Sequence, residues 1–340
     1  MVINDNYKTI HKFVNCFTYL IVHCTIYRMQ KLKNLPWRNI ISAVVLVLFA
    51  LLVVRNWSSF VTSFGAIKNA DYGWLIVAVG AMVLTYIAAA GGYLVVSIKK
   101  LSAFYTLLAQ VAAAFANKLL PSGVGGLGLN VAYLHKNKYT PTEATTVTAI
   151  NSLAAFVSFS ILIVVALLFG GLSRSTISLP KTSVLLFAFI LFLVIVVGAI
   201  VLFRFKKIRA MLIRTVRQAV DTTKTYKEEP IRLLGAVLMA TLVTFVYLLS
   251  LYASARSLGV QIGIGEIFLV YVFGAIATAA VPTPGGLGAA EAAIYAGFVS
   301  YGVPATQALS VVLAYRFITY WVPILPGYIS FQYLQRKKLL

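Results

Sequence analysis

The feature that most constrains this chain is a series of long apolar runs, each of a length that suits a membrane-embedded helix. They lie near 38–54, 72–96, 101–120, 140–169, 183–203, 231–255, 265–281 and 305–334. A helix needs about 20 mostly apolar residues to cross the hydrocarbon core, and these runs lack the two-residue alternation of a membrane β-barrel. Of 340 residues, 61% are hydrophobic and 11% charged, with a mean hydropathy of +0.91. The sequence therefore predicts an all-α, polytopic helical membrane protein.

The net charge of +21 does not indicate a nucleic-acid partner. The basic residues lie in short connections between apolar runs and form no continuous basic face on a soluble domain. The cysteines Cys16 and Cys24 form neither a disulfide framework nor a metal-ligand pattern. We therefore expect no nucleic acid, no metal and no cofactor.

The first 28 residues differ from the rest of the chain. The apolar-leaning stretch 13–26 is too short for a span and lacks a small-residue cleavage site. The segment "MQKLKNLPWRN", from Met29, is typical of a cytoplasmic start that leads into a membrane helix. We expect translation to begin at Met29, with 1–28 an N-terminal extension and 29–340 a single transmembrane domain.

The basic connections predict the topology, because Lys and Arg concentrate on the cytoplasmic side of membrane proteins. Placing all of them inside requires two apolar segments, 101–134 and 265–299, to enter and leave by the same face as re-entrant helical hairpins. About six full spans and two hairpins then satisfy the rule. Both termini of the domain are cytoplasmic in this arrangement, and the protein lies in the cytoplasmic (inner) cell membrane.

Each predicted hairpin contains the same short motif. "PSGVGGLGLN" at 121–130 and "PTPGGLGAAE" at 282–291 share GGLG. The chain thus divides into repeat 1, about 38–169, and repeat 2, about 183–334, whose hairpins open to opposite faces. Such inverted-topology repeats are common in secondary transporters, where broken helices form a binding site near the midplane. The alternative is that both motifs are helix kinks at close contacts.

The first motif also spells GxGxxG through Gly123, Gly125 and Gly128, but no strand precedes it, which excludes a dinucleotide-binding turn. In a helical hairpin the prolines stop one helix and the glycines permit a turn. The next helix then starts with free N–H groups that suit an anion. Two such turns facing each other predict a polar chamber that favours anions.

Three charged residues fall inside the apolar units: Lys118, Glu291 and Arg316. A charge within the bilayer is costly and is a functional candidate by default. One explanation is a structural ion pair between Glu291 and Arg316. The other is a head-group site in which Lys118 and Arg316 bind an anion and Glu291 orients Arg316 or carries protons. The predicted substrate-binding residues are Lys118, Pro121, Gly125, Gly126, Gly128, Pro284, Gly285, Gly286, Gly288, Glu291 and Arg316.

Polar residues elsewhere carry weaker signals. Asn117, Asn130 and Asn151 add polar groups at similar depth and are equally suited to hydrogen bonds between helices. The basic stretch 204–230 has an apolar stripe at helical spacing and is either a solvated loop or a helix lying on anionic lipid.

Residues 281–327, "VPTPGGLGAAEAAIYAGFVSYGVPATQALSVVLAYRFITYWVPILPG", resemble the lysylphosphatidylglycerol synthase transmembrane region family, also called flippase-like integral membrane proteins. The first repeat is similar through Asn117, Leu120, Pro121 and Gly125. It departs from many relatives, which have a Gly-Glu pair where this chain has Gly125 and Gly126. The resemblance covers about 29–335. The positions that match the family's signature are Pro282, Pro284, Gly285, Gly286, Gly288, Glu291, Tyr315 and Arg316.

The resemblance implies a lipid-handling membrane domain. In the multiple peptide resistance factor such a domain is thought to flip aminoacylated phospholipid and is fused to a soluble aminoacyl-transferase. This chain ends at Leu340, so we expect it not to make lysyl-lipid by itself and to work with a separate soluble lipid-modifying enzyme. A homo-oligomer is also compatible with the sequence.

The sequence thus predicts a flippase-like lipid translocase for an anionic, aminoacylated or glycosylated lipid. The alternatives are a small-solute secondary transporter and a membrane accessory of lipid or polysaccharide modification. No triad, metal cluster or paired carboxylates are visible, so we expect no enzyme activity.

Overall fold

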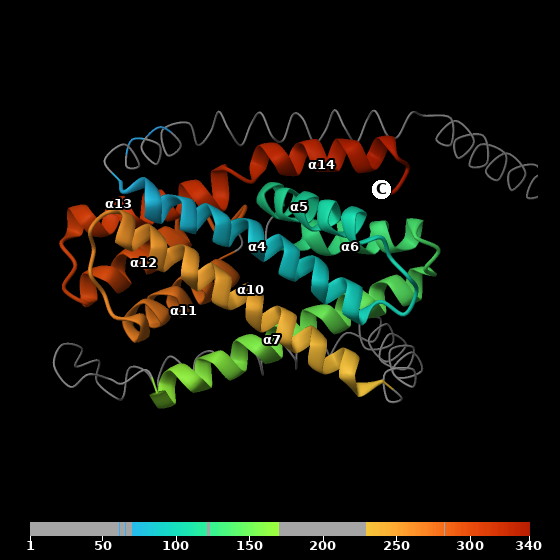
Figure 1. Cartoon of the computed structure of the whole chain (residues 1–340), viewed down its shortest axis with the longest axis horizontal. Helices are drawn as coiled ribbons and strands as arrows, with labels where there is room; N and C mark the ends of the chain where they lie inside the picture. The colour runs from blue at the N-terminus through green and yellow to red at the C-terminus, as the bar shows by residue number, and fades with distance from the viewer. Residues whose placement is uncertain (1–60, 62–64, 66–69, 121–122, 170–228, 282) are drawn as a thin grey trace, which may run out of the picture. The chain divides into compact units, whose positions relative to one another are not determined.

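The computed structural model describes residues 61, 65, 70–120, 123–169, 229–281 and 283–340, which all belong to one unit of the chain, 51–340. The predicted extension 1–28, the spans 38–54 and 183–203, and the stretch 204–228 lie outside the described residues. Figure 1 shows the helices of the described part. They are α4 (Tyr72–Val96), α5 (Ala103–Leu119), α6 (Val124–Lys136), α7 (Pro141–Phe169), α10 (Pro230–Ser257), α11 (Ile264–Ala280), α12 (Ala289–Ser300), α13 (Ala305–Arg316), the π-helical turn η1 (Phe317–Trp321) and α14 (Ile324–Arg336).

Four segments of the described part are long and apolar enough to cross a membrane. They are α4, the first part of α7, α10 and the combined segment Ala305–Arg336. The shorter helices α11 and α12 are apolar as well. The prediction of an all-helical, polytopic membrane protein is therefore confirmed.

Polar residues at the helix starts explain where the helices begin. Asp71 precedes α4, and its Oδ1 accepts a hydrogen bond from the N–H of Gly73 (2.7 Å). Before α7, Glu143 accepts from the N–H of Thr140, and the hydroxyl of Thr140 accepts from the N–H of Glu143. Pro230 is the first residue of α10, where its missing N–H costs no hydrogen bond.

The helices α4 and α10 pack against each other and run in opposite directions (Figure 1). At one end the N–H of Asp71, just before α4, donates to the carbonyl of Ser257, the last residue of α10 (2.7 Å). At the other end Arg232, near the start of α10, donates to the carbonyl of Ser97, just after α4 (2.7 Å). These two contacts fix the pair as antiparallel along its whole length.

Two helical hairpins open toward opposite ends of the α4–α10 pair. The first hairpin, α5–α6, follows α4 and opens where α4 ends. The second hairpin, α11–α12, follows α10 and opens where α10 ends. Because α4 and α10 are antiparallel, the two hairpins enter from opposite sides and point their turns toward each other.

Most of the described lysines and arginines gather at the end where the first hairpin opens, which we call the basic end; Lys118 and Arg316 line a cavity, and Arg256 lies at the other end of α10. The C-terminal segment reaches the same end, because Leu334, Leu339 and Leu340 form one apolar cluster with Leu101 and Tyr133. The residues that define the basic end are Lys99, Lys100, Lys136, Lys138, Arg232, Arg336, Lys337 and Lys338.

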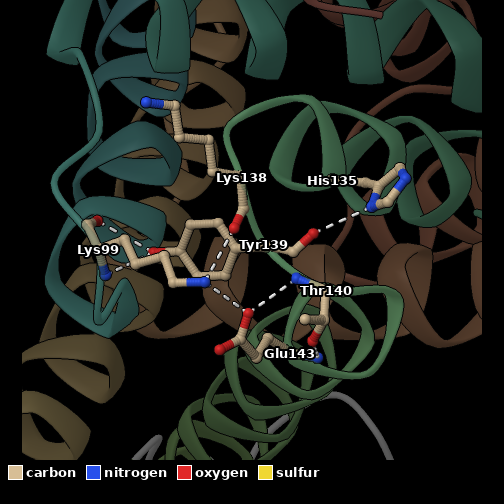
Figure 2. A network of polar contacts seen from close by, with 6 residues as sticks. All are labelled: Lys99, His135, Lys138, Tyr139, Thr140 and Glu143. Atoms are coloured by element: carbon tan, nitrogen blue, oxygen red, sulfur yellow. Dashed lines mark hydrogen bonds and ion pairs between the residues drawn. The ribbon is translucent and has the colours of Figure 1, made fainter.

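Figure 2 shows how the base of the first hairpin is held at this end. The hydroxyl of Tyr139 accepts from the N–H of Lys99 (2.7 Å) and donates to the carbonyl of Lys99 (3.0 Å). The ammonium of Lys99 donates to the carbonyl of Lys138 (2.9 Å) and pairs with Glu143 (2.6 Å). His135 contacts the carbonyl of Tyr139 through Nδ1 (2.9 Å). Lys99 therefore joins the end of α4 to the connection between α6 and α7.

The final span is not one continuous α-helix. The N–H of Val322 donates to the carbonyl of Phe317 (2.9 Å), five residues earlier, which gives the π-helical turn η1 between α13 and α14. Pro323 follows this turn, and a proline inside a helix cannot donate the regular hydrogen bond and displaces the preceding turn. The prediction of a span over 305–334 is confirmed in extent, while its interior is broken near Arg316.

The turn of the first hairpin is shorter than its sequence predicts. We expected it to extend from Pro121 to Gly128, but α6 already begins at Val124, after Gly123 at a φ of 71°. Gly125, Gly126 and Gly128 are therefore helical, and Gly125 and Gly126 allow α6 to lie close to α5. The second motif is a true glycine turn, because Gly285, Gly286 and Gly288 all have positive φ.

Candidate functional site

The facing turns of the two hairpins and the broken last span enclose a cavity of about 270 Å³, which we call the charged cavity. The first hairpin contributes the end of α5, and the second contributes both of its helices and its turn. Two cationic side chains and several hydroxyl groups lie in its wall. The described lining residues are Asn117, Lys118, Tyr247, Tyr271, Gly274, Ala275, Thr278, Gly285, Ala290, Ile294, Tyr315, Arg316, Thr319 and Tyr320.

Arg316 is held by the second hairpin. Its Nε donates to Oε1 of Glu291 (2.7 Å), and an N–H of its guanidinium donates to the carbonyl of Gly285 (3.1 Å). The Arg316 side chain is 11% exposed and that of Glu291 24% exposed. The second carboxylate oxygen of Glu291 accepts from the N–H of Gly288 at the start of α12 (2.7 Å). Glu291 thus fixes the position of Arg316 relative to the glycine turn.

Lys118 is the second cation of the charged cavity and has no such partner. The residue is 8% exposed, and its ammonium donates to the carbonyl of Ala114 at 3.4 Å, one turn earlier in α5. Among the described residues no carboxylate lies within ion-pair distance of it. A buried ammonium without a counter-charge is costly, so this side chain is suited to an anion that enters the cavity.

Tyr320 lies between the two cations. The ammonium of Lys118 is 5.7 Å from the centre of its ring, and the guanidinium carbon of Arg316 is 5.0 Å from it. Both distances suit cation–π attraction. Gly285 approaches the same ring, so that a Cβ at this position would overlap it. The positive φ of Gly285 and this close approach explain why glycine is required there.

The cavity holds an excess of positive charge. With Lys118 protonated, Lys118 and Arg316 carry two positive charges and Glu291 neutralises one of them, and an anion bound beside Lys118 would favour this protonated form. The tyrosine hydroxyls of the wall can donate hydrogen bonds to the same anion, whereas the hydroxyls of Thr278 and Thr319 already donate to the carbonyls of Gly274 and Tyr315. Chemically, the arrangement suits one anionic group such as a phosphate diester.

A second cavity of about 260 Å³ lies beside the first hairpin, and we call it the amide cavity. Asn117 and Tyr247 line both cavities. The other described lining residues are Thr85, Tyr86, Ala89, Tyr93, Gln110, Ala113, Ala114, Gly123, Gly126, Leu127, Asn130, Asn151, Ser152, Ala155 and Val243.

Amide side chains tie the two arms of the first hairpin together. Oδ1 of Asn117 accepts from the N–H of Gly126 (2.5 Å), whose carbonyl accepts from Asn130 (2.9 Å). Gln110 then donates to Oδ1 of Asn130 (2.8 Å). Asn117 and Asn130 therefore hydrogen-bond between helices α5 and α6, which is one of the two roles that the sequence left open.

The predicted site residues fall into four groups. Lys118, Gly285 and Arg316 line the charged cavity, with Glu291 paired to Arg316. Gly126 lines the amide cavity instead. Pro121 lies outside the described residues. Gly125, Gly128, Pro284, Gly286 and Gly288 are not among the residues that line either cavity.

The backbone donors of the two turns are used differently from our expectation. We expected free N–H groups at the helix starts to face an anion. The N–H of Gly126 instead donates to Asn117, and that of Gly288 donates to Glu291. The groups of the charged cavity that suit an anion are therefore the cationic side chains of Lys118 and Arg316, and these two backbone donors are already used.

Sequence reasoning missed most of the aromatic wall. Tyr247, Tyr271 and Tyr320 line the charged cavity but lie in apolar runs that contain many other aromatic residues. Only Tyr320 had a usable signal, because it follows Arg316 by four residues and such a pair lies on one helix face. Tyr247 and Tyr271 are brought to the cavity by tertiary packing alone.

A chain with four helical segments of membrane length and a charged cavity between helical hairpins is a polytopic helical membrane protein with a polar interior. The family model of the lysylphosphatidylglycerol synthase TM region matches residues 39–327. The chain belongs to this family. No curated protein matches it.

Proposed function

We propose that this protein is a lipid translocase, which moves an anionic, polar-headed lipid between the two leaflets of the cytoplasmic membrane. The head group occupies the charged cavity and the acyl tails stay in the surrounding lipid. The observation that carries the proposal is the buried ammonium of Lys118, 8% exposed and without a carboxylate partner among the described residues, next to Arg316 across the Tyr320 ring.

The arrangement of the hairpins supports alternating access to this cavity. In inverted-repeat transporters, equivalent helices are antiparallel and the substrate site lies between the two halves. Here α4 and α10 are antiparallel, and the hairpins that follow them open to opposite ends. The last helix of each half also packs on the hairpin of the other half, α14 on α5 and α7 on α11. We therefore treat the halves as inverted-topology repeats.

The basic end defines the orientation in this proposal. The positive-inside rule places Lys99, Lys138 and the C-terminal Lys337 in the cytoplasm. The first hairpin then opens to the cytoplasm and the second to the outside. The charged cavity lies where the two turns meet, so a modest movement of either hairpin would expose it to one face.

A vesicle assay tests the proposal directly. The purified protein is reconstituted with tail-labelled fluorescent phosphatidylglycerol, and dithionite quenches the label in the outer leaflet. Protein-containing vesicles should lose the inner-leaflet signal as well. Lys118→Gln should slow this loss roughly tenfold, because a charge-assisted hydrogen bond contributes about 1.5–3 kcal/mol. Lys100→Gln, an exposed lysine of the same charge, is the matched control and should not slow it.

The same vesicles distinguish the alternative functions. If the inner-leaflet label stays protected while a soluble anion is taken up, the protein is a small-solute transporter and the proposal is wrong. If neither moves, the proposal is contradicted and the role of an accessory membrane subunit gains support.

A further inference from the structure

The amide cavity differs in chemistry from the charged cavity, although the two share part of their walls. None of its described lining residues is charged. The side chains of its wall are amides and hydroxyls, which can each donate and accept hydrogen bonds. The polar side chains are those of Thr85, Tyr86, Tyr93, Gln110, Asn117, Asn130, Asn151, Ser152 and Tyr247.

A charged group in this cavity would lie without a counter-charge, which costs free energy. The amides of Gln110, Asn117 and Asn130 already hydrogen-bond within the protein. Because amides and hydroxyls each have more than one hydrogen-bonding site, an uncharged group that carries hydroxyls can bond to this wall without displacing those contacts. The volume of about 260 Å³ equals the liquid share of roughly eight water molecules, which is enough for a glycerol moiety or one sugar ring.

The hydroxyl of Tyr86 is an independent indication of such a ligand. This hydroxyl is buried and has no hydrogen-bond partner among the described residues. Tyr86 lies on α4 and lines the amide cavity. Buried tyrosine hydroxyls usually find a partner, so a group inside the cavity that hydrogen-bonds to it would complete the wall.

The two cavities are placed to hold adjacent parts of one molecule. Asn117 and Tyr247 line both of them, and Asn117 directly precedes Lys118 in α5. An anion bound by Lys118 and Arg316 would place a group attached to it beside Asn117 and Tyr247. A phosphate diester with a glycerol or sugar substituent has this sequence of an anion followed by hydroxyls.

We infer that the amide cavity is a subsite for an uncharged, hydroxyl-bearing group that is attached to the anion in the charged cavity. That this group belongs to a lipid rests on the proposed function. The inference adds which part of the lipid head group the protein recognises. Free polyols have the same hydroxyl chemistry, so the experiment separates the two sources.

The test compares two lipids that differ only in their hydroxyls. Dioleoyl phosphatidylglycerol and dioleoyl phosphatidylpropanol have the same tails, the same number of head-group carbons and one phosphate diester charge. An equal mixture is added to the purified full chain, and native mass spectrometry measures the ratio of the two bound lipids. We expect a preference of roughly 3- to 10-fold for phosphatidylglycerol, which corresponds to one or two hydrogen bonds. Equal binding of the two lipids overturns the inference.

Variants assign this preference to the amide cavity. Tyr86→Phe and Asn151→Leu should each bring the ratio toward one while total lipid binding is kept. Tyr295→Phe is the matched control, because Tyr295 packs on the cluster around α12 outside both cavities. Lys118→Gln should weaken both lipids by the same factor. If Tyr86→Phe and Asn151→Leu keep the full preference in folded protein, the subsite is not in the amide cavity and the inference is wrong.

A competition with free glycerol identifies the source. A lipid preference that survives excess glycerol supports recognition of the lipid head group, and one that glycerol removes supports a subsite that also takes soluble polyols. The readout is binding, so it does not depend on translocation. A protein that keeps the preference but moves no lipid would contradict the proposed function and leave the subsite supported.

Discussion

The Nε of Arg316 donates a hydrogen bond to Oε1 of Glu291 over 2.7 Å, while the other oxygen of Glu291 accepts from the N–H of Gly288. One carboxylate thus connects the start of α12 to the end of α13, immediately before the π-helical turn. The ion pair that the sequence offered as a structural explanation is formed, and it also lies at the charged cavity. The two explanations of these charges are therefore compatible.

The stabilising effect of this pair can be separated from helix capping. Glu266 accepts from the N–H of Gly263 at the start of α11 (2.9 Å), just as Glu291 does at the start of α12. Glu266 has no ion pair among those of the described residues. We expect Glu291→Gln to lower the free energy of unfolding by about 1–2 kcal/mol more than Glu266→Gln, because only the former also removes an ion pair. Denaturant unfolding in micelles measures both, and equal losses would show that capping explains the whole effect.

We expect the ammonium of Lys118 to lower the free energy of unfolding and to be needed for lipid translocation. Its ammonium is buried without a described counter-charge, and methionine has a similar length without the cost of desolvation. Lys118→Met should leave the free energy of unfolding unchanged or raise it, while translocation of phosphatidylglycerol falls about tenfold. Unfolding curves and the vesicle assay are run on the same preparation. Unchanged translocation in this variant would remove Lys118 from the site.

The close packing of the first hairpin predicts opposite effects for two glycines of α6. A Cβ at Gly125 would overlap the carbonyl oxygen of Ala116, whereas a Cβ at Gly128 meets nothing within 4 Å. Gly125→Ala should cost about 1–3 kcal/mol, because backbone has to shift. Gly128→Ala should be neutral or stabilise by up to about 1 kcal/mol, as alanine favours the helix. Thermal unfolding ranks the two variants, and a similar loss in both would mean that the hairpin is not packed this closely.

The base of the first hairpin depends more on Tyr139 than on the visible salt bridge. The side chains of Lys99 and Glu143 are 40% and 33% exposed, so their pair should contribute no more than about 1 kcal/mol. Tyr139 is 2% exposed and satisfies both backbone groups of Lys99. We expect Tyr139→Phe to cost about 1–3 kcal/mol and Lys99→Met less. Hydrogen exchange at Lys99 should rise in Tyr139→Phe, and the reverse ranking of the two variants would contradict this account.

The described spans could be predicted closely from the sequence. The apolar run 72–96 has the same bounds as α4, and the run 231–255 lies within α10. Length and apolar composition determine these helices, since the polar residues at their ends cannot enter the hydrocarbon core. The hairpin segments were also recognised, because charge placement left no other topology.

The interior of the site could be predicted only in part. Lys118, Glu291 and Arg316 stood out because charges are rare in apolar runs. The start of α6 at Val124 was missed, because it depends on the close packing of Gly125 against Ala116. The π-helical turn was also missed, because it depends on how the regular helix is interrupted ahead of Pro323. Tyr247 had no sequence signal, and the amide cavity had only the weak signal of Asn117, Asn130 and Asn151, because its residues come together from α4, α5, α6, α7 and α10.

The most direct measurement of the central claim is the side from which each hairpin opens. Cys16 and Cys24 are replaced by serine, and single cysteines are introduced at Lys136, at the end of α6, and at Ser300, at the end of α12, both of which are exposed. A membrane-impermeant maleimide is then applied to right-side-out and inverted vesicles. The account predicts that Lys136→Cys reacts only from the cytoplasmic face and Ser300→Cys only from the opposite face. Labelling of both from one face would contradict it.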